Sequence, residues 1–247
     1  MRGSRKRRGA PVTHGRLYVV PNLLGLVAPE QVLPAHTIAV ARGLAHYVVE
    51  NAKPSRAFLK SLSPLLPLQQ IDIVELGETP AAARCAELLA PARAGRDMGL
   101  LSDAGCPGIA DPGALLVAEA HREGIGVSPL VGPSSVALAL MASGMNGQGF
   151  AFHGYLPVKT DARAAALARV EADSLRTGYA QLFIETPYRN AALLAAIAET
   201  CKPATRLCVA ADLTLATESV VSQPISAWRG ADFTRYMKRP AIFVLQA

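Results

Sequence analysis

The stretch "LLSDAGCPGIADPGALLV", residues 100–117, joins an apolar run typical of a buried strand to an apolar run typical of a helix. Between the two runs lie two short turns, Asp-Ala-Gly and Asp-Pro-Gly, with three glycines and two prolines in all. An ordinary strand-to-helix connection does not need so much conformational freedom, whereas a loop whose main chain approaches a ligand does. The stretch therefore predicts a βα unit with a ligand-binding loop at the carboxyl end of its strand.

On either side of this stretch, short apolar runs alternate with longer helical patterns. The runs that predict strands are 16–21, 45–50, 71–76, 97–102 and 126–131. The patterns that predict helices are 34–44, 53–62, 80–93, 112–123 and 133–142. Such a βαβ series indicates a mainly parallel sheet with helices on both faces.

A second series follows "GMNGQGFAFHGYLP", residues 144–157, whose four glycines and one proline predict a linker or hinge. Helices are predicted at 160–176 and 188–200, and strands at 179–185, 206–212, 218–222 and 241–246. Hairpin-like spacing among these strands indicates a mixed sheet. We therefore predict two α/β domains with a cleft between them: a basic disordered arm at 1–15, an N-terminal domain at 16–147 and a C-terminal domain at 148–247.

The charge of the chain is concentrated at its start. The chain has 51% hydrophobic and 18% charged residues, which is typical of a folded protein, and a net charge of +6. Five basic residues and no acidic one lie in the first ten positions, which leaves a net charge of +1 for the rest. The first ten positions are interpreted either as a solvated tail or as an arm that contacts RNA phosphates without specifying sequence.

Several protein classes find no support in the sequence. The apolar run after the basic start is broken by proline, asparagine and glycine, which argues against a signal peptide, and no run has the length of a membrane span. The four cysteines form no Cys-x-x-Cys pair and the five histidines have no metal-ligand spacing, so neither a disulfide framework nor a metal site is predicted. We expect a cytoplasmic protein.

Three loops are predicted at one edge of the first sheet: "PNLLG" after the first strand, "SDAGCPGIADPG" after the fourth and "LVGPSS" after the fifth. Ser134 and Ser135 begin a helix there, where a hydroxyl caps the helix or binds an anionic group. The Gly-x-Gly-x-x-Gly and Gly-x-x-x-x-Gly-Lys fingerprints are absent from the sequence, as is the Gly-x-Ser-x-Gly elbow. The loops therefore indicate a ligand site other than a usual dinucleotide or P-loop site.

The order of "LYVVP", "SDAGCPGIADPGALLV", "PLVGPSSVALALMASGM", "FAFHGYLP", "LFIETPYRN", "AADLT" and "PAIFVL" resembles the tetrapyrrole methylase superfamily of S-adenosylmethionine-dependent methyltransferases. Within it, the sequence is most similar to the branch that methylates the ribose 2′-oxygen of small-subunit ribosomal RNA. The resemblance covers residues 16–247. It implies two α/β domains, a homodimer, and S-adenosylmethionine folded into the cleft between the domains.

The resemblance also implies which residues hold the cofactor. Carboxylate and backbone groups would hold its methionine and ribose portions, and apolar residues would cover adenine. Cys106 would supply backbone rather than thiol chemistry, a reactive thiol being the alternative. The cofactor-binding residues predicted from the resemblance and the loops are Pro21, Ser102, Asp103, Gly105, Cys106, Ser134, Ser135, Phe183, Ile184, Ala210, Pro240 and Ala241.

Methyl transfer needs alignment of donor and acceptor more than acid–base chemistry, but a ribose hydroxyl is a poor nucleophile and benefits from a general base or a charged neighbour. The predicted catalytic residues are Glu50, Glu185 and Arg189, and Glu218 is a further candidate. Each could equally be a helix cap or an ion-pair partner.

The substrate loops depart from the pattern of the RNA-modifying branch. Its "EDTR" turn corresponds to "ENAKPSR" here, with Glu50 kept, and its "ARELTK" segment to "AADLTL", which loses two cationic side chains. Fewer cations weaken an RNA footprint. Three functions therefore stay open: methylation of RNA, with ribosomal RNA or the small ribosomal subunit as partner; methylation of a small tetrapyrrole-like molecule or a protein; and a non-catalytic module that binds S-adenosylmethionine.

Overall fold

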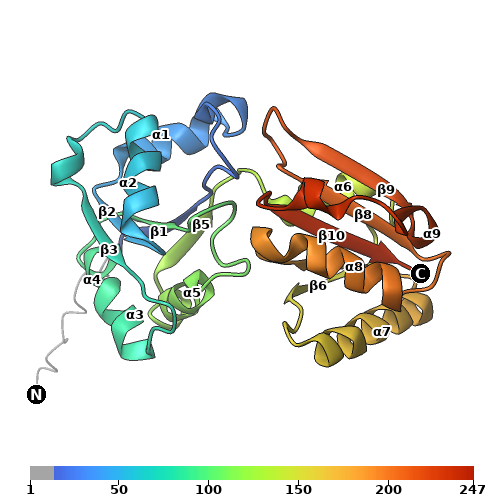
Figure 1. The fold of residues 1–247 in the computed structure, drawn as a ribbon. Helices are drawn as coiled ribbons and strands as arrows, with labels where there is room; N and C mark the ends of the chain where they lie inside the picture. The colour runs from blue at the N-terminus through green and yellow to red at the C-terminus, as the bar shows by residue number, and fades with distance from the viewer. Residues whose placement is uncertain (1–13) are drawn as a thin grey trace, which may run out of the picture. The chain divides into compact units, whose positions relative to one another are not determined.

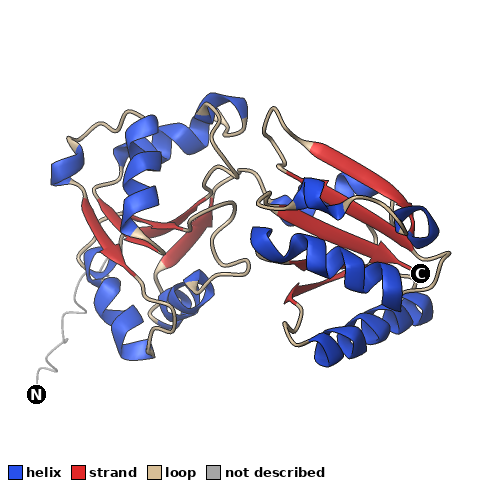
Figure 2. Cartoon of the chain, in the orientation of Figure 1, coloured by secondary structure: helices blue, strands red, loops and turns tan. Residues whose placement is uncertain are grey.

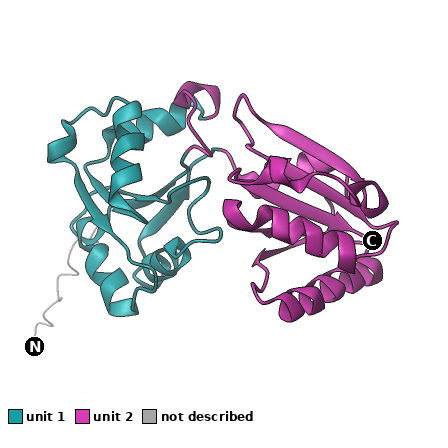
Figure 3. Cartoon of the chain, viewed as in Figure 1, with its two compact units in different colours: residues 1–22, 33–132 teal, residues 23–32, 133–247 magenta. Residues whose placement is uncertain are grey.

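The computed structural model describes residues 14–247, so most of the predicted basic arm lies outside the described residues (Figure 1). The chain divides into two compact units (Figure 3). Unit 1 contains the chain up to Asn22 and residues 33–132, and unit 2 contains residues 23–32 and 133–247. This division falls earlier than the expected boundary at 147/148, because the helix at Ser135–Ser143 packs on strands of the second sheet.

The sheet of unit 1 is entirely parallel, with strand order β3-β2-β4-β1-β5. Its strands are β1 (Arg16–Val20), β2 (His46–Val49), β3 (Asp72–Glu75), β4 (Met98–Leu101) and β5 (Gly126–Pro129). Its helices are α1 (Ala35–Gly43), α2 (Ala52–Ser61), α3 (Ala82–Leu88), α4 (Ala90–Arg93) and α5 (Gly113–Arg122). Every predicted element of this series is present, with ends shifted by one or two residues, and the predicted helix at 80–93 is divided into α3 and α4.

Both faces of the first sheet are covered, because successive side chains of a strand point to opposite faces. On β2, Tyr47 is buried toward α1, where its hydroxyl donates to the carbonyl of Ala41 at 2.6 Å. The next residue, Val48, belongs to the core cluster built with α3 and α5. Figure 2 shows the helices above and below this sheet.

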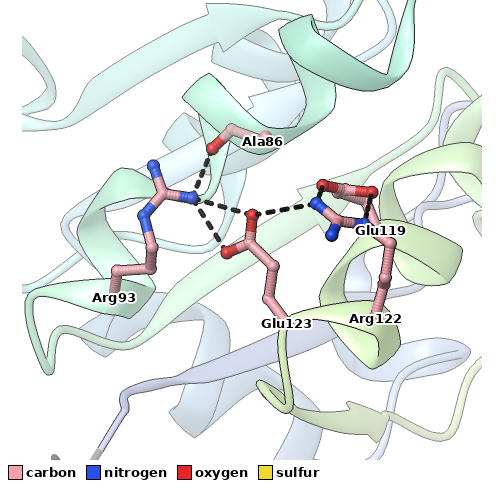
Figure 4. A network of polar contacts seen from close by, with 5 residues as sticks. All are labelled: Ala86, Arg93, Glu119, Arg122 and Glu123. Atoms are coloured by element: carbon pink, nitrogen blue, oxygen red, sulfur yellow. Dashed lines mark hydrogen bonds and ion pairs between the residues drawn. The ribbon is translucent and has the colours of Figure 1, made fainter.

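A polar network fastens α4 to α5 at the margin of that core (Figure 4). Arg93 Nη1 donates to both carboxylate oxygens of Glu123, at 2.8 and 3.0 Å, and to the carbonyl of Ala86 at 2.6 Å. Arg122 pairs with Glu119, whose side chain is buried, through Nε at 2.8 Å and through Nη2. The hydrogen bonds from Arg122 hold the pKa of Glu119 below its ordinary value. This network holds helices in place away from the glycine-rich loop.

The sheet of unit 2 is mixed, as predicted, with strand order β6-β7-β10-β8-β9. β6 and β7 are parallel and the remaining pairs are antiparallel. The strands are β6 (Phe150–Tyr155), β7 (Ala180–Ile184), β8 (Arg206–Ala211), β9 (Ser219–Pro224) and β10 (Ala241–Gln246), and the helices are α6 (Ser135–Ser143), α7 (Thr160–Thr177), α8 (Asn190–Thr200) and α9 (Ile225–Trp228). One core cluster joins the sheet to α7, α8 and α9, and a second joins its other face to α6.

The strand β6 corrects the interpretation of residues 144–157 as a linker or hinge. Residues 150–155 pair in parallel with β7 at the edge of the second sheet, and the register shifts between Phe152 and Tyr155. Gly154 has φ +64° within this irregularity. A glycine in a left-handed conformation is typical of a β-bulge, so Gly154 serves a bent edge strand, whereas Gly144, also left-handed, ends α6.

Candidate functional site

The glycine-rich loop lies where the topology of unit 1 predicts a ligand site. β4 and β1 are neighbours, but the helix that follows β4, α5, covers one face of the sheet and the helix that follows β1, α1, covers the other. Helices on opposite faces after two neighbouring strands mark a switch point of the topology, and the carboxyl edge beside such a point is the usual ligand position in these sheets. Residues 102–112 follow β4 at this edge.

The first half of the loop is held by a buried amide that follows β1. Asn22 Nδ2 donates to the carbonyls of Ser102, at 2.9 Å, and Asp103, at 3.0 Å, and its backbone N–H donates to the carbonyl of Gly105 at 2.8 Å. Gly105 has φ +68°, a conformation that glycine adopts without strain. The sequence predicted Ser102, Asp103 and Gly105 as site residues but not Asn22, whose separation of 80 residues from its partner leaves no local signal.

The second half of the loop is held by its own aspartate. Asp111 accepts from the N–H of Gly108, with both oxygens at 2.9 Å, and from the N–H of Gly113 at 2.7 Å. Gly108, with φ +85°, and Ala110, with φ +64°, are both left-handed. Asp111 was not predicted either, although the Asp-Pro-Gly turn that contains it was the available signal.

Carboxylates gather at the same edge. Glu50 follows β2 and its Oε2 accepts from the N–H of Asp103 at 3.0 Å. Glu75 ends β3 and its Oε1 accepts from the N–H of Ala52 at 2.7 Å. Partial burial raises the pKa of Glu50, opposed by the hydrogen bond from Asp103 and reinforced by the charges of Asp103 and Asp111. Asp103 is exposed, but partial desolvation, followed by the charge of Glu75, likewise raises its pKa.

The other predicted residues of unit 1 contribute shape rather than charge. Pro21 is buried against Gly132, where an added Cβ would lie 2.4 Å from the proline Cγ, so the loops after β1 and β5 pack closely. Burial raises the pKa of the Cys106 thiol, which keeps it protonated and disfavours the alternative of a reactive thiolate.

The predicted residues of unit 2 fall on different faces of its sheet. Phe183 is fully buried and its ring stacks on Phe243, with centroids 5.8 Å apart. Ile184 and Ala210 belong instead to the cluster that includes α6. Because neighbouring residues of a strand face opposite ways, the side chains of Phe183 and Ile184 cannot both contact one ligand on one face. Ala241 lies with Phe183 in the first cluster, and Pro240 is exposed just before β10.

Ser134 caps α6, which is one of the two roles predicted for it, the other being to bind an anionic group. Its side chain accepts from the N–H of Ala137 at 3.4 Å, and Ser135 is the first residue of the helix. Both side chains are partly exposed.

The candidates Glu185 and Arg189 are paired with each other. Glu185 Oε1 accepts from Arg189 Nε at 2.9 Å and Nη2 at 2.7 Å, and from the N–H of Thr186 at 2.6 Å. The glutamate side chain is 1% exposed and the arginine side chain 40% exposed. Glu218, the further candidate, accepts from the N–H of Thr214 at 2.7 Å and so serves a turn.

A second ion pair occupies the substrate loop that departs from the RNA-modifying pattern. Arg239 Nε donates to Asp212 Oδ2 at 2.7 Å, and Nη2 donates to the carbonyl of Thr217 at 2.5 Å. Asp212 has φ +51° and Thr214 has φ +74°, so this turn is strained. The buried amide of Asn190 donates to the carbonyls of Tyr236 and Arg239, which fixes the chain before β10.

Residues 14–247 contain neither a cluster of metal ligands nor a membrane-spanning helix. Within this part of the chain, no group of three or more His, Cys, Asp or Glu side chains is placed to hold a metal ion. No helix among the same residues has both the length and the apolarity to span a membrane.

The charges and the shape of the loop suit S-adenosylmethionine. The molecule carries two positive centres, its sulfonium and its ammonium group, and the carboxyl edge of unit 1 presents Glu50, Glu75 and Asp103 with no cation among their described partners. The main chain at Gly105 and Gly108 carries no side chain that would keep a ligand at a distance.

Comparisons with known proteins agree on one family. Residues 37–227 match the family model described as tetrapyrrole (corrin/porphyrin) methylases. The chain is 33% identical to ribosomal RNA small subunit methyltransferase I of Micromonospora olivasterospora over 74% of this chain and 55% of that protein. It is 29% identical to the protein of the same name from Escherichia coli O157:H7 over 94% of this chain and 78% of that protein.

A solved structure supports the fold. The crystal structure of uroporphyrin-III C-methyltransferase from Thermus thermophilus, complexed with S-adenyl homocysteine, aligns with a TM-score of 0.55 at 18% identity, over 94% of this chain and 97% of that chain. The chain thus has the architecture predicted from its motifs. It spans about half the length of the first of the curated relatives, and nearly four fifths of the second.

Proposed function

The chain belongs to the tetrapyrrole (corrin/porphyrin) methylase family, and on this premise we propose that it is an S-adenosylmethionine-dependent methyltransferase that acts on the ribose of small-subunit ribosomal RNA. The proposed substrate rests on the similarity to ribosomal RNA small subunit methyltransferase I over 94% of the chain. We further propose a cytoplasmic location, where such a substrate is found, and a homodimer, as the family resemblance implies.

The loop of residues 102–112 holds the cofactor. Its backbone, fixed by Asn22 and Asp111, supplies main-chain groups to the methionine and ribose portions, and Asp103 supplies negative charge. When bound, S-adenosylmethionine supplies a methyl group that its sulfonium has already activated. What remains for the chain is to orient the donor and acceptor in line and to exclude water.

Glu50 is the best placed of the three catalytic candidates to accept the ribose proton. It lies beside the loop, one of its oxygens is held by the N–H of Asp103, and its raised pKa makes it a better base than an ordinary glutamate. Glu185, in contrast, uses one oxygen on Arg189 and on the N–H of Thr186, an arrangement that suits positioning more than proton transfer.

Calorimetric titration with S-adenosylmethionine and S-adenosylhomocysteine, followed by tritium transfer from the methyl donor to purified small ribosomal subunits, tests this proposal. Binding of both ligands and label in a ribose 2′-O-methyl nucleotide are expected. Asp103→Ala should abolish cofactor binding, and unchanged affinity would reject the site. Glu50→Gln should lower the rate of transfer while leaving cofactor affinity within a few-fold.

A small acceptor is the second candidate, because the chain beyond its first ten residues has a net charge of only +1. Cofactor binding without label in ribosomal RNA, together with label in a tetrapyrrole such as uroporphyrinogen, would favour it over RNA. Cofactor binding with no methylated product in any cellular extract would instead support a non-catalytic binding module.

A further inference from the structure

Two exposed tyrosines lie at the same end of the second sheet in a chain that is poor in aromatic residues. Only 5% of residues are aromatic, yet Tyr155 is 59% exposed and Tyr188 is 73% exposed. Tyr155 ends β6 and pairs with Ile184, the last residue of β7, and Tyr188 lies in the short helix Pro187–Arg189 that follows β7. A single exposed ring is ordinary, but several exposed rings on one surface are typical of a binding site.

Cations lie beside these rings. Arg189 follows Tyr188 directly, in the short helix after the end of β7 that pairs with Tyr155. The backbone N–H of Lys238 donates to the carbonyl of Pro187 at 2.9 Å, which brings this exposed lysine to the same short helix. We call Tyr155, Tyr188, Arg189 and Lys238 the tyrosine surface.

Hydrogen bonds hold the segments that carry Arg189 and Lys238 in the tyrosine surface. Glu185 fixes Arg189 through two hydrogen bonds, and Asn190, fully buried, holds the carbonyls of Tyr236 and Arg239 on either side of Lys238. The carboxylate of Glu185 is 1% exposed, whereas 40% of the arginine side chain is accessible to a further partner. A fixed surface loses little entropy when it binds a flexible strand.

Aromatic faces next to cations suit single-stranded nucleic acid. Unpaired bases stack on tyrosine rings, and lysine or arginine contacts the adjoining phosphates. We propose that the tyrosine surface binds the unpaired RNA segment that carries the methyl-acceptor nucleotide, with bases stacked on Tyr155 and Tyr188 and phosphate against Lys238 and Arg189. This inference deepens the proposed function and rests on it for the identity of the RNA.

The direct test uses RNA binding without turnover. Fluorescence anisotropy with a 5′-fluorescein-labelled decauridylate measures affinity for wild type, Tyr188→Ala, Tyr155→Ala and the double variant. Loss of one stacked base weakens binding by roughly 5- to 150-fold. Tyr188→Trp keeps a stacking face and is expected to bind as well as wild type, whereas Tyr188→Leu keeps bulk without the aromatic face and is expected to bind as poorly as the alanine variant.

Tyr179→Ala is the matched control. Tyr179 is 46% exposed and immediately precedes β7, whereas Tyr188 follows it, so the two tyrosines lie at opposite ends of one strand. Its ring packs on Gly149, so its thermal midpoint is compared with wild type before use. Its RNA affinity should equal that of wild type, and every variant should bind S-adenosylmethionine normally.

Two further readouts separate this inference from the proposed function. RNA carrying 4-thiouridine is cross-linked to the protein, and we expect peptides containing Tyr155 or Tyr188 to carry the adduct. If wild type binds the RNA through these tyrosines but transfers no methyl group to small subunits, the proposed function fails and the tyrosine surface stands. If the double variant binds RNA and methylates subunits as wild type does, or if wild type binds no RNA, the tyrosine surface is overturned.

Discussion

Asp103 and Glu50 are exposed, so the raised pKa of each carboxylate implies only a small cost in stability when it is ionised. Asp103 and Glu50 both have raised pKa values because their ionised forms are partly desolvated and face other carboxylates. A group whose pKa rises on folding destabilises the folded state once it is ionised, and this effect disappears at pH values below its unfolded pKa. Such strain is common where a site must bind a ligand of opposite charge.

Replacing Asp103 by asparagine should therefore raise the thermal midpoint at pH 7. The gain should be fully present above the raised pKa and should vanish as the pH falls below 3.8, the ordinary value for aspartate. Calorimetric scans between pH 3 and pH 8 measure it. Asp173→Asn, which removes the partner of the exposed Arg176, serves as the control and should not raise the midpoint. A lower midpoint for Asp103→Asn at pH 7 would contradict this account.

The ion pair of Asp212 with Arg239 is expected to matter more for stability than a surface pair. The carboxylate is 9% exposed and the guanidinium 24% exposed, so Arg239→Ala leaves a poorly solvated charge. We expect a loss of about 2–4 kcal/mol in the free energy of unfolding, measured by urea titration. Arg176→Ala removes an exposed i,i+3 pair and should cost less than about 0.5 kcal/mol. If both variants lose the same free energy of unfolding, burial does not make the pair of Asp212 and Arg239 more stabilising than an exposed pair.

At the scale of elements, the bent edge strand β6 depends on one glycine. Gly154 is left-handed with φ +64°, and a Cβ there would meet nothing within 4 Å, so the penalty for alanine is conformational and not steric. Gly154→Ala should lower the stability of unit 2 by about 1 kcal/mol. Gly147→Ala is the control, since that glycine also has open space but no positive φ. Urea titration of both variants should show the difference, and equal midpoints would argue against strain at the bulge.

Most elements were predictable because their apolar runs are bounded by clear breaks. β10 matches its predicted limits, with Pro240 directly before it, and the mixed pairing of the second sheet followed from short spacings. β6 was missed because Gly149 precedes and Gly154 interrupts an edge strand that lacks strict alternation. The glycine-rich loop was found from its composition, but its ties to Asn22 and Glu50 connect residues 53 to 83 positions apart. Tertiary hydrogen bonds of that kind have no local sequence signal.

At the scale of the whole molecule, the uneven charge predicts how RNA affinity depends on salt. Five cations lie in the first ten residues, whereas the remaining chain has a net charge of +1. If the first ten residues contact phosphates, their removal should lower RNA affinity and reduce the salt slope of log K by up to about 3.5, which is about 0.7 per cation for single strands. Anisotropy titrations from low to high salt measure the slope, with S-adenosylmethionine affinity as the control. An unchanged slope would identify these residues as a solvated tail.

The division of the chain has a consequence for the order of assembly during synthesis. Residues 23–32 belong to unit 2, although the chain before and after them belongs to unit 1, and Leu24 packs in the cluster formed by α6, β8 and β10. This segment leaves the ribosome long before its partners, so a nascent chain can complete unit 1 while residues 23–32 still lack the surface on which they pack. Unit 2 is complete only when β10 has been synthesised, although its first segment, residues 23–32, is synthesised much earlier. A bicistronic split after Gly132 would therefore separate unit 2 into two polypeptides, which must find each other before it can fold.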